Sequence, residues 1–376
     1  MKTKEFGLYI HIPFCVRKCS YCDFLSMPTS ERLQEDYVKA LITEISLTAE
    51  KTKGKVKSLY FGGGTPSLLT VSQMERIAES LYSCFSILPN AEISMEVNPG
   101  TIEKAKLNTY HRIGINRLSM GLQSTQNDEL QMLGRIHTYE EFEKNYQLLR
   151  VEGFRNISID LLLAIPNQSQ AQMLSGLQRL INLRPEHISV YSLILEEGTK
   201  FYEIRDSLNL PTEENEREMY WAADAYLIKN GYYPYEISNY ALKGRECQHN
   251  LLYWSDEDYI GLGIGAASYW NGVRWKNTSD IKQYIKSPLP SAIREITQEK
   301  DEQRHLEDYL FLGLRKREGI LIDKLNQSFD QPLQKIYALE IEKMQKQGLL
   351  EIVDGYLRLT QKGIDFSNMV FAEFLR

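Results

Sequence analysis

Short apolar segments rich in strand-forming residues alternate, through the first two-thirds of the chain, with segments in which apolar residues recur every three or four positions. The first pattern predicts buried strands and the second predicts amphipathic helices. The predicted strands are residues 6–14, 56–61, 91–99, 115–123, 156–166 and 187–195. The predicted helices are residues 30–50, 71–85, 101–111, 139–152 and 170–183.

This alternation, with short connections, predicts parallel strands joined by right-handed crossovers. The fold class is therefore α/β. We expect a partial (β/α)6 barrel similar to a TIM barrel, and a doubly wound sheet is the alternative. In barrel enzymes the chemistry lies at the carboxyl ends of the strands, so the site is expected there.

From about residue 294 the pattern changes to long polar helices, followed by two alternating segments around Asp354 and Gly355. An Asp-Gly pair in this setting is typical of a hairpin, and helices followed by a hairpin predict a helical, winged-helix-like extension. Residues 319–376 hold seven Lys and Arg against eight Asp and Glu, so a packing or lid role is favoured over DNA binding. We expect a core at 1–235, a connecting segment at 236–292 and a C-terminal domain at 293–376.

Composition narrows the class of protein. Hydrophobic residues make up 43% and charged residues 25%, which is typical of a globular protein, and a net charge of −6 gives no field that attracts nucleic acid. No run of about 18 apolar residues predicts a membrane span, and the N-terminus lacks the pattern of a signal peptide. Five cysteines, three of them within eight residues, do not form a secreted disulfide framework, and we expect a cytoplasmic protein.

The three clustered cysteines are the sharpest motif. Cys15, Cys19 and Cys22 follow the first predicted strand with the spacing C-x3-C-x2-C, in a segment that Pro13 makes a loop. Neighbouring lysine and arginine side chains favour thiolates. Three thiolates can hold an iron–sulfur cluster and leave one iron free for another ligand. The alternatives are a zinc site with His11 as fourth ligand, and three buried structural thiols.

Further polar or glycine-rich positions lie at or near the ends of the predicted strands. The segment 62–66 is Gly-Gly-Gly-Thr-Pro, in which the backbone can approach a ligand closely, and no Lys-Ser/Thr follows it as in a P-loop. Asp160 lies within an apolar strand and needs a partner, and the guanidinium of Arg135 suits a carboxylate. Gly261-x-Gly263-x-x-Ala266 imitates a dinucleotide motif but lacks the following βαβ unit.

The cysteine motif resembles the signature of the radical S-adenosylmethionine (SAM) superfamily. The segments YIHIPFC, FGGGTPS, EVNP, SMGLQS and IDLLLAIP, in this order, resemble the oxygen-independent coproporphyrinogen oxidase group. This resemblance implies a [4Fe-4S] cluster on Cys15, Cys19 and Cys22, with SAM on the fourth iron. It implies SAM contacts from Tyr9, Tyr21 (adenine), Gly63, Gly64, Thr65, Glu96, Gln123, Arg135 (carboxylate) and Asp160.

Two features separate this chain from the oxidases of that group. The oxidases have a fourth cysteine where Phe24 stands, and a longer segment before the cluster. Residues 249–254, His-Asn-Leu-Leu-Tyr-Trp, match the motif H-N-x-x-Y-W of the HemW-type haem chaperones. An imidazole is a good ligand for haem iron, so His249 is expected to bind the iron while Tyr253 and Trp254 pack on the porphyrin. The alternative is a core aromatic cluster around a hydrogen-bonded histidine.

The resemblance therefore implies a haem chaperone that binds haem, a [4Fe-4S] cluster and SAM, and transfers haem to an acceptor protein. An electron donor for the cluster is a further expected partner, and nucleic acid is not. The alternative is a radical SAM enzyme acting on a porphyrinogen, in which the reduced cluster cleaves SAM to a deoxyadenosyl radical. A third interpretation gives the cysteines a structural zinc ion.

Overall fold

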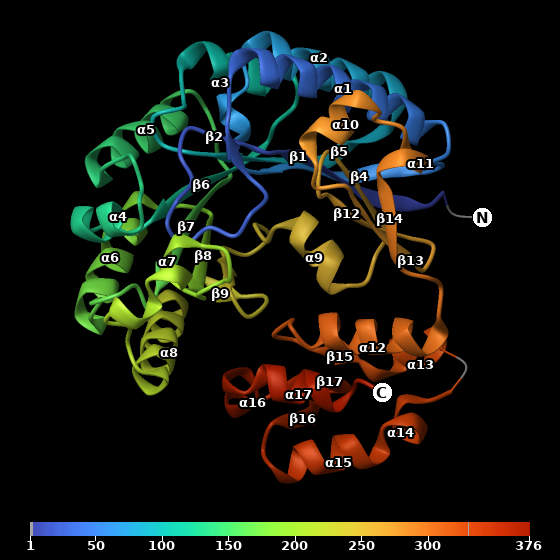
Figure 1. Cartoon of the computed structure of the whole chain (residues 1–376). Coiled ribbons are helices and arrows are strands. Elements are labelled where there is room, and N and C mark those ends of the chain that lie inside the picture. The colour runs from blue at the N-terminus through green and yellow to red at the C-terminus, as the bar shows by residue number, and fades with distance from the viewer. Residues whose placement is uncertain (1–2, 330) are drawn as a thin grey trace.

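The computed structural model describes residues 3–329 and 331–376. Its centre is a twelve-stranded sheet in the order β14-β13-β12-β11-β1-β4-β5-β6-β7-β8-β10-β9 (Figure 1). The six predicted strands are adjacent and parallel within it. They are β1 (Glu5–Ile12), β4 (Lys55–Gly63), β5 (Ser86–Val97), β6 (Arg117–Gln123), β7 (Ile157–Leu163) and β8 (His187–Ser192). The α/β prediction is confirmed.

Helices form an arc along the outside of this sheet in Figure 1. They are α1 (Glu31–Ala49), α2 (Val71–Cys84), α3 (Lys104–Arg112), α4 (Asn127–Met132), α5 (Tyr139–Val151), α6 (Gln170–Leu183) and α8 (Glu213–Lys229). The short helix α7 (Lys200–Glu203) lies inside this arc, where the Phe201 amide donates to the Ser20 carbonyl in the loop after β1. Local sequence sets several of their starts: Thr70, Thr138 and Ser169 each cap a helix and complete a capping box with the residue three positions on.

Strands from residues 233–298 extend the sheet at both ends. At one end β11 (Tyr259–Leu262) runs parallel to β1, and β12 (Ala267–Trp270), β13 (Val273–Asn277) and β14 (Arg294–Gln298) follow antiparallel. At the other end β10 (Asn239–Ala241) and β9 (Tyr233–Pro234) pair antiparallel beside β8. The two outermost strands do not pair with each other in the described residues, so the barrel is partial.

Gly261 and Gly263 belong to this extension. A Cβ on Gly263 would lie 2.4 Å from the Tyr37 hydroxyl, and its amide donates to the buried Glu44 carboxylate at 2.8 Å. The dinucleotide-like motif therefore serves close packing between β11 and α1.

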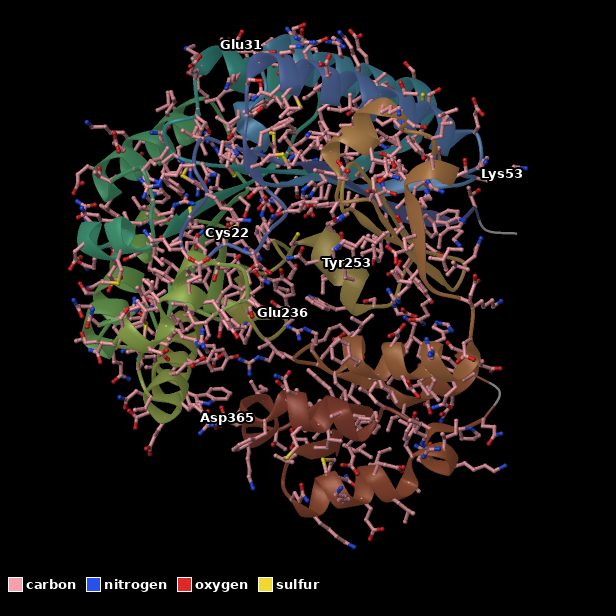
Figure 2. The ribbon with its side chains drawn as sticks, viewed as in Figure 1. Cys22, Glu31, Lys53, Glu236, Tyr253 and Asp365 are labelled. Atoms are coloured by element: carbon pink, nitrogen blue, oxygen red, sulfur yellow. The ribbon has the colours of Figure 1, made fainter. Side chains whose placement is uncertain are left out.

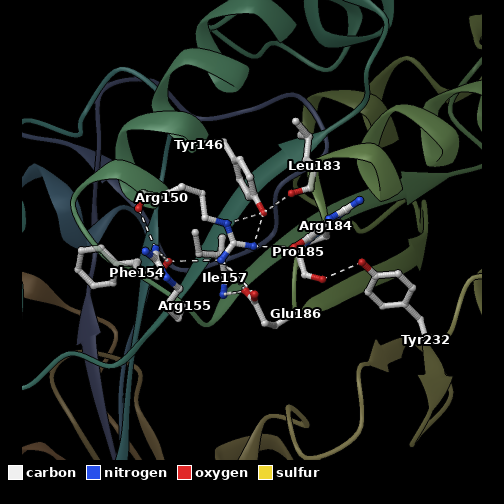
Figure 3. A network of polar contacts seen from close by, with 10 residues as sticks. All are labelled: Tyr146, Arg150, Phe154, Arg155, Ile157, Leu183, Arg184, Pro185, Glu186 and Tyr232. Carbon is white, nitrogen blue, oxygen red and sulfur yellow. Dashed lines mark hydrogen bonds and ion pairs between the residues drawn. The ribbon is translucent and has the colours of Figure 1, made fainter.

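A polar network holds α5 against the amino-terminal ends of β7 and β8 (Figure 3). The Arg150 guanidinium donates to both Glu186 carboxylate oxygens, at 3.0 and 2.9 Å, and to the Arg184 carbonyl at 2.7 Å. Glu186 also accepts the Ile157 amide at 2.9 Å. The network lies at the end of the strands opposite to their carboxyl ends, and it fixes the spacing of β7 and β8.

The C-terminal region has a hydrophobic cluster of its own, between Leu306 and Phe374. Its elements are α12 (Glu302–Gly313), β15 (Ile320–Leu321), α13 (Ile322–Ser328), α14 (Leu333–Ile336), α15 (Ala338–Lys346), β16 (Leu350–Val353), β17 (Tyr356–Leu359), α16 (Gln361–Asp365) and α17 (Ser367–Glu373). The antiparallel pair β16–β17 turns at Asp354 and Gly355, both with positive φ, so the predicted hairpin is confirmed. No helix of the described chain is long and apolar enough to span a membrane.

Candidate functional site

The carboxyl ends of the parallel strands surround a cavity of about 470 Å³. Eleven of the predicted site residues line it: Cys15, Cys19, Cys22, Tyr21, Gly63, Gly64, Thr65, Glu96, Gln123, Arg135 and Asp160. They come from β4, β5, β6 and β7, from the loop after β4, from the segment 14–22 after β1 and from the connection between α4 and α5. The topology therefore brings residues that are far apart in the sequence to one site, and we call this space the cysteine cavity.

The three thiols are free and partly exposed. Cys15 ends the short strand β2 (Phe14–Cys15), which pairs with β3 (Met27–Pro28), so both ends of the cysteine loop are held together. The Cys15 Sγ lies 3.6 Å from Thr65 Oγ1. Burial raises the pKa of Cys22 to about 11 and outweighs the nearby charge of Lys18. Thiols of this kind lose their protons when they bind iron.

The hydrogen bonds of His11 bear on whether it could be the fourth ligand of a zinc ion. One ring nitrogen of His11 lies 3.0 Å from the Tyr9 hydroxyl and the other 2.8 Å from the Leu25 carbonyl, so neither faces the thiols. Among residues 3–329 and 331–376, no three His, Cys, Asp or Glu side chains converge on a site for a single metal ion.

Arg135 is held beside the cysteines. One terminal nitrogen donates to Asn98 Oδ1 and to the Gly121 carbonyl, both at 2.6 Å, and the other lies 3.6 Å from Cys19 Sγ. Its Nε is buried without a partner. A buried donor of this kind is costly unless a ligand satisfies it, and a carboxylate is the group that fits a guanidinium.

Two carboxylates face the same cavity from β5 and β7. Glu96 accepts hydrogen bonds from the Tyr60 hydroxyl and the Gly63 amide, each at 3.0 Å. Asp160 accepts the Ser119 hydroxyl at 3.1 Å. Burial, and then the neighbouring charge of Asp160, raise the pKa of Glu96 to about 7. These acceptors suit an ammonium group and sugar hydroxyls.

Gln123 and Gly63, which line the cysteine cavity, both have a positive φ. Gln123 has φ of 79° and follows a register shift between β6 and β7, so its side chain is turned out of the regular strand pattern. Gly63 has φ of 115°, and a Cβ there would lie 2.5 Å from the His11 ring. Glycine is therefore required where β4 passes His11.

A second cavity, of about 310 Å³, lies between the sheet and the C-terminal region. Tyr253 and Trp254, which end helix α9 (Gln248–Trp254), line it, as does Leu312 of α12. We call it the interdomain cavity. Tyr9 lines this cavity and is absent from the lining of the cysteine cavity, so its contact with SAM stays a prediction.

His249 is buried, with 1% of its surface exposed. Its Nδ1 lies 2.8 Å from the Ser58 hydroxyl and its Nε2 2.8 Å from the Tyr253 hydroxyl, and its ring stacks on Tyr60 with centroids 5.2 Å apart. Burial, and then the Arg117 charge, lower its pKa to about 3, so the imidazole is neutral. This is the hydrogen-bonded aromatic cluster that the sequence left open as the alternative to direct haem ligation.

Helix α9 nevertheless reaches both cavities, because Asn250 lines the cysteine cavity while Tyr253 lines the interdomain cavity. Figure 2 shows Tyr253 on this helix and Cys22 in the loop after β1. The motif at 249–254 therefore lies between the two cavities.

Sequence reasoning missed several residues of the cysteine cavity, among them Tyr60, Asn98, Arg117 and Ser119. Arg117 is a buried charge in the predicted strand 115–123, the same signal that singled out Asp160. Asn98 stands within the EVNP segment. Both could have been found by asking which polar groups in apolar strands lack a local partner.

Two family matches cover separate parts of the chain. Residues 9–179 match the Radical SAM superfamily and residues 301–366 match the HemN C-terminal domain. In structure, the chain is similar to coproporphyrinogen III oxidase (HemN) from Escherichia coli, with a TM-score of 0.86 over 99% of this chain and 90% of the other. At 24% sequence identity this likeness establishes the fold alone.

Whole-chain relatives are more similar in sequence. The protein named heme chaperone HemW from Lactococcus lactis subsp. lactis is 36% identical over 100% of this chain and 98% of its own length. Its namesake in Bacillus subtilis is 34% identical, with 98% of both chains covered. The chain therefore belongs to the HemW family of the radical SAM superfamily.

Proposed function

We propose that this chain is a haem chaperone that binds a [4Fe-4S] cluster, SAM and haem, and passes haem to an acceptor protein. The observation that carries the proposal is the placement of α9, whose H-N-x-x-Y-W motif contacts the cysteine cavity through Asn250 and the interdomain cavity through Tyr253 and Trp254. Its whole-chain relatives bear the name heme chaperone HemW.

The residues of the cysteine cavity fit the cluster and SAM. Cys15, Cys19 and Cys22 would hold the cluster, and the unpartnered Nε of Arg135 suits the SAM carboxylate. The Gly63–Thr65 segment and Glu96 would receive its ammonium group. Gln123 and Asp160 would bind its polar nucleoside atoms, and Tyr21 would pack on adenine. When bound, the cluster supplies one-electron chemistry.

The interdomain cavity suits haem as cargo. Aromatic side chains on β1, α9, β11 and β12 provide flat apolar surfaces, and Arg274, which pairs with Asp256 and Asp308, lines the cavity beside them. The acceptor is a protein that lacks its haem, and an electron donor would serve the cluster. We propose that the protein works in the reducing cytoplasm, since five cysteines, three of them clustered in one loop, are not the pattern of a secreted disulfide framework.

A porphyrinogen oxidase is the second candidate, because the fold is that of coproporphyrinogen III oxidase. Phe24 argues against it. This side chain is 59% exposed and lines the cysteine cavity at the position where the oxidases carry a further cysteine.

Anaerobic reconstitution with iron and sulfide, followed by haem titration, tests the proposal. We expect haem binding near one equivalent, and no decarboxylation of coproporphyrinogen III. Cys15→Ala, Cys19→Ala and Cys22→Ala should each remove the cluster absorption, whereas Cys84→Ala, in α2, should keep it. Turnover of coproporphyrinogen III without haem binding would establish the oxidase instead.

A further inference from the structure

Tyr253 and His249, both of the motif at 249–254, differ in their access to the interdomain cavity. Tyr253 lines the cavity, whereas His249 is buried with both ring nitrogens hydrogen-bonded. To reach a haem in this cavity, the imidazole would have to displace Tyr253 and break its bond to Ser58. The phenol oxygen of Tyr253 needs neither change.

We infer that Tyr253 supplies the oxygen that binds the haem iron in the interdomain cavity, and that His249 is a positioning residue that orients it. This inference rests on the proposed function, and it names the place and the ligand of the haem. Tyrosine is an established type of ligand for ferric haem.

Other tyrosines of the cavity are less suited. The Tyr269 hydroxyl lies 3.4 Å from the Asp256 carboxylate, and the Tyr259 hydroxyl is hydrogen-bonded to Arg274. The Tyr9 hydroxyl lies 3.0 Å from His11 Nδ1. His11 has a fixed tautomer, because its other nitrogen faces a carbonyl that can only accept a hydrogen bond. A Tyr9 phenolate would therefore face a lone pair.

His249 differs because its second partner is the Ser58 hydroxyl, which can donate or accept. The Ser58 hydroxyl can therefore donate to Nδ1 while Nε2–H donates to the Tyr253 oxygen. When Tyr253 binds the iron, its hydroxyl proton leaves to water in the cavity, and Nε2–H continues to donate to the bound oxygen.

One proton is thus released to solvent for each ferric haem bound, and the imidazole stays neutral throughout. The oxidation state of the iron does not change.

The cavity walls suit the rest of a haem. Trp254 and Tyr269 offer aromatic surfaces, and Arg274 offers a guanidinium that is shared with Asp256 and Asp308. Leu312 closes the cavity from α12, so the C-terminal region supplies one wall. The site therefore requires both parts of the chain.

Resonance Raman spectra of the haem-loaded full chain test the ligand. We expect an iron–phenolate stretching band in the wild type and in Tyr233→Phe, an exposed control. The band should vanish in Tyr253→Phe. His249→Gln can still donate to the phenolate, so it should keep the band at a shifted frequency. An unchanged haem spectrum in Tyr253→Phe, or loss of iron ligation in His249→Gln alone, would overturn the inference.

Two tryptophan variants, one inside the interdomain cavity and one on the surface, test where the haem binds. Leu312→Trp should weaken haem binding at least tenfold, whereas Leu339→Trp, at a position 77% exposed on α15, should leave it unchanged. Cluster absorption and SAM binding serve as the check of folding for every variant. Wild-type haem affinity in a folded Leu312→Trp protein would place the haem elsewhere and leave the proposed function standing. A wild type that binds no haem would overturn both.

Discussion

Arg135 is a buried side chain that we expect to bind the SAM carboxylate. Two of its nitrogens are engaged by Asn98, Gly121 and Cys19, and the third is buried without a partner. A charged hydrogen bond contributes about 1.5–3 kcal/mol. Arg135→Ala should therefore weaken SAM binding by about ten- to a hundredfold, measured by calorimetry on the clustered protein.

The exposed Arg32→Ala is the matched control and should bind SAM as the wild type does. Arg135→Lys keeps the charge but loses the fork of donors, so an intermediate affinity is expected. An unchanged dissociation constant in Arg135→Ala would remove Arg135 from the SAM site.

The carboxyl of Glu96 gives a prediction about pH. Its pKa is raised from 4.5 to about 7, so the folded protein keeps a proton that the unfolded chain releases above about pH 4.5. The contribution of Glu96 to stability is therefore present at low pH and is lost as pH rises toward 7. Urea denaturation at pH 5, 6 and 7 should show that the free energy of unfolding falls as the pH rises. In Glu96→Gln this fall should be smaller by about 1 kcal/mol per pH unit.

Glu44, buried with a pKa also raised to about 7, should contribute a similar slope that persists in Glu96→Gln. The exposed Glu213→Gln should leave the slope as in the wild type. An identical slope in Glu96→Gln and the wild type would contradict the assignment.

At the scale of elements, hydrophobic periodicity predicted the six central strands and the five helices between them to within a few residues. It succeeded because these elements bury long regular faces. Hydrophobic periodicity did not predict the short strands from β9 to β14. Strand β11 has only four residues, and its last two, Gly261 and Leu262, lead directly into a glycine-rich turn. Its pairing with β1 depends on tertiary contacts.

The sequence predicted which residues form part of the candidate site, but not the directions of their side chains. Motif resemblance predicted the three cysteines and eight further residues of their cavity. These residues meet because the strand order brings the carboxyl ends of the strands together. It could not show that His249 is buried behind Tyr253, or that Tyr9 faces the interdomain cavity. Side-chain direction depends on packing against β4 and α12, which residue spacing does not encode.

The network of Figure 3 gives a prediction for one element. Arg150→Ala removes the hydrogen bonds that join α5 to Glu186 and Arg184, so the free energy of unfolding should fall by about 1.5–3 kcal/mol. Chemical denaturation measures this loss. Because the network is remote from the cysteine cavity, SAM affinity should not change. A free energy of unfolding equal to that of the wild type would mean that the network does not stabilise the packing of α5.

At the scale of the whole molecule, side-chain contacts dock the C-terminal region on the core. The Trp221 indole donates to Asp365 at 2.8 Å, and Arg317 pairs with Asp224 and donates to the Tyr220 hydroxyl at 3.0 Å. We propose that the C-terminal region is a separate unit, because its hydrophobic cluster, from Leu306 to Phe374, is distinct from that of the sheet. The expected boundary at residue 293 lies too early for this unit, because β14 pairs with β13 in the sheet.

Arg317→Ala should loosen this docking without unfolding the core. Hydrogen exchange should become faster along α12 and around Asp365, while the central strands keep the protection of the wild type. The exposed Arg155→Ala should change neither region. Equal exchange in Arg317→Ala and the wild type would show that other contacts hold the two parts together.

The central claim is that this chain hands haem to another protein by contact. Stopped-flow mixing of the haem-loaded protein with increasing apomyoglobin, a haem-free acceptor, tests it most directly. Delivery through a complex predicts a transfer rate that rises with acceptor concentration. A rate that stays constant at the speed of spontaneous haem release, at every acceptor concentration, would contradict the account.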